Sequence, residues 1–117
     1  RIDTIKKKLN LLIDKLKKKN KTIHGYAAST KGNVLLQYFN LDNSKIDFIS
    51  DKNPAKTNLF TPGTNIRIIS ENDSRKKAPD FYIVLAWHFK KEILLREKKL
   101  IKKGTKFIFP LPKIKVI

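Results

Sequence analysis

Residues 22–33 read TIHGYAASTKGN, a short apolar run followed by a polar turn. The run at 22–28 has the length and composition of a buried strand. The segment 29–33 combines hydroxyl, lysine, glycine and asparagine residues, which predicts a turn. A short helix is expected to follow, from residue 34 to about residue 40. A strand, a turn and a helix in this order predict the first half of a unit whose next strand is parallel to the first.

Four segments downstream also have the character of strands. The clearest is 81–86, a continuous apolar run of the kind found in a sheet that is covered on both faces. The others are 46–50, 66–69 and 106–109. Residues 52–65 are rich in Pro, Gly, Asn and Thr and predict a loop.

Two longer segments have the periodicity of helices. Apolar residues recur at three- and four-residue steps over residues 2–19, with lysines between them, which predicts an amphipathic helix that stops at Asn20. Residues 89–103 predict a further helix that stops at Gly104.

The alternation of strands and helices predicts one α/β domain over residues 1–117. We expect three layers, with a mostly parallel sheet of about four to five strands. The helix at 1–19 is expected to pack on this domain. In such sheets, ligands bind beyond the carboxyl ends of the strands, where the strand order reverses.

The composition is strongly basic, with a formal net charge of +17. Most of this charge lies in residues 1–22 and 88–106, two segments with helical periodicity, so we interpret it as solvated helix faces. The chain has 23 Lys against only 4 Arg, whereas base-reading proteins favour the bidentate guanidinium of Arg. We therefore expect nucleic acid to bind only non-specifically and with strong salt dependence.

The turn at 29–33 is a candidate anion site. Backbone N–H groups at a helix N-terminus suit a phosphate or carboxylate, and Ser29, Thr30 and Lys31 add hydroxyl and ammonium donors. The pattern is not GxGxxG, because Ala27 and Thr30 stand at the second and third glycine positions. An ordinary turn capped by Ser29 or Thr30 fits the sequence equally well.

Asp51 follows Gly25 by 26 residues and ends the next expected strand. A carboxylate at this place accepts ribose hydroxyls in dinucleotide-binding domains. The alternative is that Asp51 caps the turn at 51–54.

The two histidines give little sign of catalysis. We interpret His24 as a packed strand residue, and His88, at the end of the fourth strand, remains open between a functional and a structural role. With no Cys in the chain, we expect neither a disulfide framework nor a metal site. No triad or carboxylate pair stands out, so no catalytic residue is predicted.

Four motifs follow one another along the chain: GYAASTKGN at 25–33, DKNP at 51–54, TPGT at 61–64 and LAW at 85–87. In this order they resemble the C-terminal domain of the S-adenosylmethionine-dependent C-methyltransferases, whose pattern reads G-Y-G-A-S-x-K-G-N, D-x-N-P, T-P-G-T and L-A-W-N. The resemblance covers residues 5–115. It implies a Rossmann-like domain that follows a zinc-binding N-terminal domain and a central methyltransferase domain.

The resemblance also implies which domain binds the cofactor and which binds the substrate. The central domain binds S-adenosylmethionine and carries the catalytic residues, so this domain is expected to bind no cofactor. Its expected role is to hold the substrate, a nucleotide-linked sugar or another phosphate-bearing small molecule. His88 stands where the family has Asn, and Ala27 replaces a family Gly. The implied substrate-binding residues are Tyr26, Ser29, Thr30, Lys31, Gly32, Asn33, Asp51, Asn53, Trp87 and His88.

Two other functions remain open. The Lys-rich segments at 6–21 and 90–103 fit a module that binds polyanions or nucleic acid. A methyl group at Ala27 narrows the approach of a phosphate to the backbone, which fits a degenerate domain that packs on its neighbours without a ligand.

The first residue is Arg1 and the chain has no Met, which indicates a fragment of a longer, multidomain protein. We therefore do not expect this domain alone to transfer a methyl group. The longest apolar run, at 81–87, is far shorter than the roughly 18 residues that span a bilayer. No secretory leader is visible, so we expect a cytoplasmic protein with no membrane partner.

Overall fold

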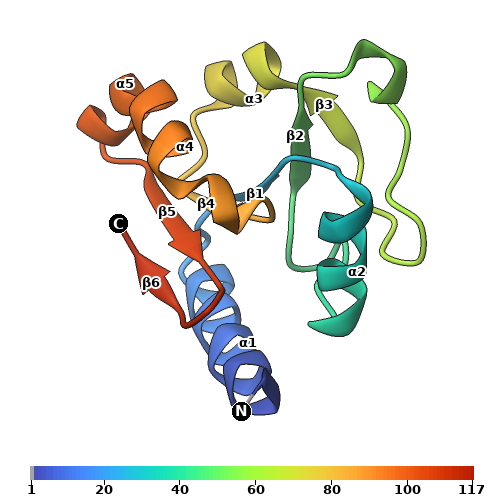
Figure 1. Ribbon diagram of the computed structural model, residues 1–117, viewed down its shortest axis with the longest axis vertical. Helices are drawn as coiled ribbons and strands as arrows, with labels where there is room; N and C mark the ends of the chain where they lie inside the picture. The colour runs from blue at the N-terminus through green and yellow to red at the C-terminus, as the bar shows by residue number, and fades with distance from the viewer. Residues whose placement is uncertain (1) are drawn as a thin grey trace.

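Six short strands form one sheet in the computed structural model, which describes residues 2–117 (Figure 1). The order across the sheet is β3-β2-β1-β4-β5-β6. Neighbouring strands are parallel from β3 to β5, and β6 is antiparallel to β5. The strands are β1 (Ile23–Tyr26), β2 (Phe48–Asp51), β3 (Ile68–Ser70), β4 (Phe81–Val84), β5 (Lys106–Phe109) and β6 (Lys115–Val116).

Helices cover both faces of the sheet, which gives the expected three layers. One face packs against α1 (Ile2–Lys18) and α2 (Thr30–Tyr38). The other face packs against α3 (Glu71–Lys77), α4 (Lys90–Arg96) and α5 (Lys98–Lys102), which lie on the opposite side of the sheet from α1 in Figure 1. Two short 3₁₀ helices complete the chain, η1 (Pro54–Lys56) and η2 (Trp87–Phe89).

The sheet has a different core on each face. In β1, Ile23 packs in the aliphatic core beneath α1 and α2, whereas Tyr26 packs in the more aromatic core beneath α4 and α5. Strand alternation places Gly25 on the side of Ile23, and an added Cβ there would collide with the side chain of Ile49 in β2. The end of the Ile49 side chain therefore occupies the space over Gly25 and would have to move for a larger residue at position 25.

The N-terminal helix is confirmed as an amphipathic element. Its buried residues are Ile5, Leu9, Ile13 and Leu16, spaced by three or four positions on one face. Full burial of a side chain of this size contributes about 1.5–3 kcal/mol, so this face holds the helix on the sheet. Asn20 ends the helix with a φ of 59°, in the left-handed region that Asn tolerates.

His24 is packed inside the domain, as the sequence predicted. Its side chain is 2% exposed, and its Nδ1 lies 2.7 Å from the hydroxyl of Ser74, which lies 2.6 Å from the hydroxyl of Tyr82. Burial lowers the pKa of His24 to about 4 and raises the pKa of Tyr82 to about 12. Both rings are therefore neutral at physiological pH and serve the core of the second face.

The first helix after β1 begins earlier than expected. The sequence predicted a turn at 29–33 and a helix from residue 34, whereas α2 begins at Thr30. The cause is the side chain of Ser29, whose hydroxyl oxygen accepts a hydrogen bond from the Gly32 N–H at 2.9 Å and so caps the helix.

The expected helix at 89–103 is divided. It consists of α4 and α5, which meet at Glu97, and the preceding η2. Glu97 is 2% exposed, because its carboxylate turns inward to Arg75 and Tyr26. The helix still ends at Gly104, which has a φ of 107°.

The sheet has six strands, one more than the upper limit expected. The additional strand β6 is only two residues long and follows Pro110 and Pro112, beyond the last expected strand at 106–109. It is held by two backbone hydrogen bonds between Phe107 and Ile117, of 2.7 and 2.8 Å. No helix in the described part of the chain is long and apolar enough to cross a membrane.

Candidate functional site

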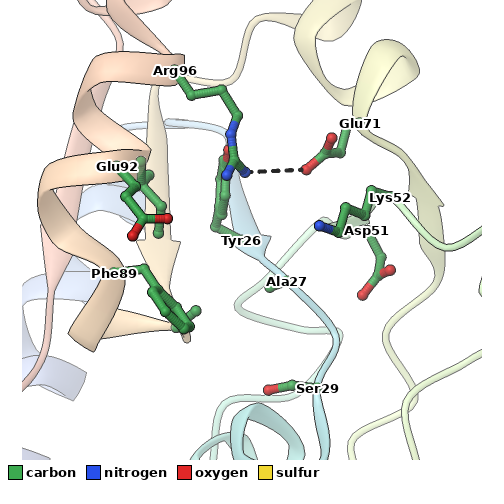
Figure 2. A pocket seen from close by; sticks show the side chains of 11 residues that line it. Tyr26, Ala27, Ser29, Asp51, Lys52, Glu71, Phe89, Glu92 and Arg96 are labelled. Carbon is green, nitrogen blue, oxygen red and sulfur yellow. Dashed lines mark hydrogen bonds and ion pairs between the residues drawn. The ribbon is translucent and has the colours of Figure 1, made fainter.

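The strand order reverses between β1 and β4, and a pocket lies at this point. The chain leaves β1 toward α2 on one face and leaves β4 toward η2 and α4 on the other, so the two loops diverge. The pocket has a volume of about 310 Å³. Its lining residues, shown in Figure 2, are Tyr26, Ala27, Ser29, Asp51, Lys52, Glu71, Ala86, Phe89, Glu92, Ile93 and Arg96. We call it the switch-point pocket.

Charged side chains face each other across this pocket. Glu92 and Arg96 come from α4, while Lys52 and Glu71 come from the ends of β2 and β3 (Figure 2). The Arg96 guanidinium lies 3.9 Å from a Glu71 carboxylate oxygen, a long contact that leaves Arg96 available to other acceptors. The pocket thus offers both donors and acceptors to a polar ligand.

Apolar groups complete the switch-point pocket. Phe89 at the end of η2 is 47% exposed, which is unusual for a phenylalanine, and its ring lies beside the pocket in Figure 2. Ile93 and Ala86 lie on the same side, and Ala27 lies at the end of β1. A flat apolar surface beside charged groups suits a ring that carries hydroxyl groups.

The predicted anion turn is partly closed by its own hydrogen bonds. The N–H of Gly32 donates to Ser29 Oγ at 2.9 Å, and the N–H of Asn33 donates to Ser29 O at 2.9 Å. Within residues 2–117, the first-turn amides of Thr30 and Lys31 have no backbone acceptor in α2, as is general at helix N-termini. Both residues are exposed, so the ammonium group of Lys31 is accessible there.

Gly32 allows close packing at the start of α2, and Asn33 has a buried side-chain oxygen. A Cβ on Gly32 would lie 3.1 Å from the Cβ of Leu85 and 3.3 Å from the carbonyl oxygen of Ala27, so glycine allows α2 to approach the loop after β1 closely. The Asn33 Oδ1 is buried and has no hydrogen-bond donor among the described residues.

Ala27 adopts a conformation that favours glycine. Its φ is 79°, in the left-handed region, and it lines the switch-point pocket. Its N–H is bonded to Ser50 O at 2.7 Å, which fixes the backbone in this strained form. The methyl group therefore stands at the pocket where a glycine would leave the backbone bare.

Asp51 and Asn53 make hydrogen bonds to the backbone of the loops that follow β1 and β2. The two carboxylate oxygens of Asp51 accept the N–H groups of Ala28 at 2.7 Å and Asn53 at 2.8 Å. The Asn53 side chain caps η1 by accepting the Ala55 N–H at 3.0 Å. The hydrogen bonds of Asp51 are thus those of a residue that caps the turn, which was the alternative prediction. Asp51 also lines the switch-point pocket.

The sequence did not predict the ion pair between Arg75 and Glu97, which contacts the pocket residue Tyr26. Arg75 in α3 donates to both carboxylate oxygens of Glu97, at 2.9 and 2.7 Å, and the Tyr26 hydroxyl donates to the same carboxylate. Burial acts to raise the pKa of Glu97, but hydrogen bonds from Arg75 and Tyr26 outweigh it and lower that pKa. Burial, followed by the bond to Glu97, raises the pKa of Tyr26. Tyr26 is therefore a positioned neutral donor. A charged pair 22 positions apart has no sequence signature.

Trp87 and His88 lie apart from the other predicted residues. They line a groove with Phe109 and the segment before β6, on the far side of η2 from the switch-point pocket. The structure therefore brings Tyr26, Ser29 and Asp51 to one pocket and places Trp87 and His88 in another.

The groups that line the switch-point pocket suit the binding of a polar ligand. Among residues 2–117 there is no group of three His, Asp or Glu side chains arranged to hold a metal ion. The buried His24 has no access to the switch-point pocket, because Ser74, Tyr82 and Phe48 surround its ring. The pocket can accept hydrogen bonds from hydroxyl groups and donate hydrogen bonds to them.

Two comparisons with known proteins bear on these features. The sequence profile of the C-methyltransferase C-terminal domain family matches residues 1–112. The C-methyltransferase NovU of Streptomyces niveus is 39% identical over 97 residues, which are 83% of this chain and 23% of that protein. The chain thus spans less than a quarter of the length of this relative.

Proposed function

This chain belongs to the family of C-methyltransferase C-terminal domains, and on that premise we propose that it holds the substrate while another part of the parent protein transfers the methyl group. The proposed substrate is a nucleotide-linked sugar or a similar phosphate-bearing molecule. The observation that carries the proposal is the switch-point pocket, which lies where α/β sheets of this order bind ligands.

The chemistry of the pocket suits the sugar part of such a substrate. Glu92 and Glu71 are acceptors for ring hydroxyls, and Arg96 and Lys52 are donors. The exposed ring of Phe89 provides an apolar surface for one face of the sugar. Ser29, which caps α2, also lines this pocket, and Thr30 and Lys31 follow it as the first residues of that helix.

We propose that S-adenosylmethionine binds to another domain of the parent protein. The Cβ of Ala27 stands where a cofactor would need a bare backbone. We therefore derive no step of the methyl transfer from this chain.

Calorimetric titration with a nucleoside diphosphate-sugar tests the proposal. Removal of a charged hydrogen-bond acceptor costs about 1.5–3 kcal/mol, so Glu92→Gln should weaken binding roughly tenfold or more. Asp73→Asn removes an exposed carboxylate from α3, outside the switch-point pocket, and should leave the affinity within about twofold. No heat of binding at millimolar ligand, or equal effects of the two variants, would contradict the proposal.

A second candidate function, favoured by the net charge of +17, is the binding of polyanions by the lysine faces of α1 and α4–α5. It predicts that affinity for duplex DNA falls steeply with salt and does not depend on DNA sequence. Affinity that persists at high salt, or that Glu92→Gln changes, would argue against this candidate.

A further inference from the structure

A second cavity, of about 610 Å³, lies between η2 and the segment that leads into β6. We call it the η2–β6 groove. Aromatic side chains line one part of it, Trp87, His88 and Phe109, and lysines line another, Lys90, Lys113 and Lys115. Among the described residues that line this groove, none is acidic.

The charge of this groove is opposite to that of the switch-point pocket. The pocket lining has three carboxylates, those of Asp51, Glu71 and Glu92, against the two cations of Lys52 and Arg96. A diphosphate carries two or more negative charges. It is repelled by the pocket as a whole and attracted by the three ammonium groups of the groove.

The two cavities are neighbours along η2. A shallow depression on this helix shares Phe89 and Glu92 with the switch-point pocket and shares His88 and Lys90 with the groove. A ligand with a neutral end and an anionic end can therefore lie across η2 with each end in the matching cavity.

The rings of Trp87 and His88, which are half-buried and exposed, are the surfaces of this groove on which a base can stack. Trp87 packs edge-on against His88, with ring centres 5.6 Å apart. Lys90 Nζ lies 5.4 Å from the centre of the Phe109 ring, which is almost fully buried and forms the bottom of the groove. Aromatic side chains interleaved with cations are the general arrangement for holding a base beside its phosphates.

We propose that the η2–β6 groove binds the diphosphate and the base of a nucleoside diphosphate, and that the sugar end reaches over η2 into the switch-point pocket. This proposal rests on the proposed function, because it divides that same substrate between the two cavities. It assigns Trp87, Lys113 and Lys115 as ligand-binding residues.

The chain provides its own reporter, because Trp87 is its one tryptophan. We would titrate the 117-residue chain with a nucleoside diphosphate, with inorganic pyrophosphate and with the nucleoside diphosphate-sugar, and record tryptophan fluorescence. The nucleoside diphosphate should give a saturable change, and pyrophosphate should compete with it. Lys113→Gln/Lys115→Gln should weaken binding about tenfold, whereas Lys7→Gln/Lys8→Gln, which removes the same charge from the exposed face of α1, should change it less than twofold.

The outcomes separate this inference from the proposed function. If calorimetry detects the nucleoside diphosphate-sugar but fluorescence and Lys113→Gln/Lys115→Gln do not respond, the groove proposal is wrong and the pocket stands. If the groove responds to the nucleoside diphosphate but the sugar adds no affinity and Glu92→Gln has no effect, the groove stands and the sugar pocket fails. Equal losses in the two double-lysine variants would show a general polyanion effect and overturn the groove proposal.

Discussion

Glu97→Gln tests whether the buried ion pair holds the pocket in shape. Glu97 is 2% exposed and accepts two hydrogen bonds from Arg75 and one from Tyr26. Breaking a fully buried pair by removing one partner costs about 3–5 kcal/mol, and the loss is smaller here because the Arg75 side chain is 32% exposed. The amide keeps one acceptor oxygen, and Arg75 retains a carboxylate oxygen of Glu71 at 3.6 Å, so we expect the free energy of unfolding to fall by about 2–3 kcal/mol.

Urea unfolding followed by circular dichroism measures this loss. Glu92→Gln is the matched control, because Glu92 lies in the adjoining helix α4 with an exposed side chain, and it should change the free energy of unfolding by less than about 0.5 kcal/mol. A loss below about 0.5 kcal/mol in Glu97→Gln would refute the view that this pair supports the second face of the sheet.

The pH dependence of Glu97→Gln adds an independent check. The folded pKa of Glu97 is below its ordinary value of 4.5, so the unfolded chain binds the proton first as the pH falls. The stability from the pair is therefore complete above about pH 4.5 and is lost below it, as the pH falls through the folded pKa. Glu97→Gln should lose less stability on acidification than the native chain, and an unchanged acid limb would contradict the assignment.

Two further predictions concern the backbone at Ala27 and the buried ring of His24. Ala27→Gly relieves a left-handed φ of 79° and should raise the free energy of unfolding by up to about 1 kcal/mol. The control Ala55→Gly, in the exposed 3₁₀ helix η1, should lower the free energy of unfolding. A lower free energy of unfolding in both variants would show that Ala27 is not strained. Burial lowers the pKa of His24 from 6.5 to about 4. The neutral His24 ring therefore contributes fully to the free energy of unfolding above pH 6.5, and this contribution, on the order of 3 kcal/mol, is lost as the pH falls to 4. An NMR titration that shows the His24 ring protonating near pH 6.5 in the folded chain would contradict its burial.

The layer structure could be predicted from local patterns. The buried face of α1 at Ile5, Leu9 and Ile13 follows directly from residue spacing, and the apolar run at 81–86 contains β4. Strand alternation with helices then leads to a parallel sheet. Boundaries that depend on a single side-chain contact were harder to predict. The Ser29 cap places the start of α2 earlier than expected, and the inward turn of Glu97 divides the last helix.

The candidate site was predictable only in part. Tyr26, Ser29 and Asp51 were expected at strand ends and do line one pocket, because parallel strands bring their carboxyl ends to one edge. The pairing of Arg75 with Glu97 and the position of Arg96 opposite Glu71 depend on how α3 and α4 dock, which no local pattern encodes. The separation of Trp87 and His88 from the pocket follows from η2, a single helical turn that the sequence did not indicate.

Chemical-shift mapping of a nucleoside diphosphate-sugar on the isotope-labelled chain tests the central claim most directly. We expect the backbone amides of residues 26–31, 51–52 and 86–96 to shift in a saturable way, since these segments surround the switch-point pocket and η2. Shifts confined to the lysine face of α1, or no shifts at millimolar ligand, would show that this edge of the sheet does not bind the substrate.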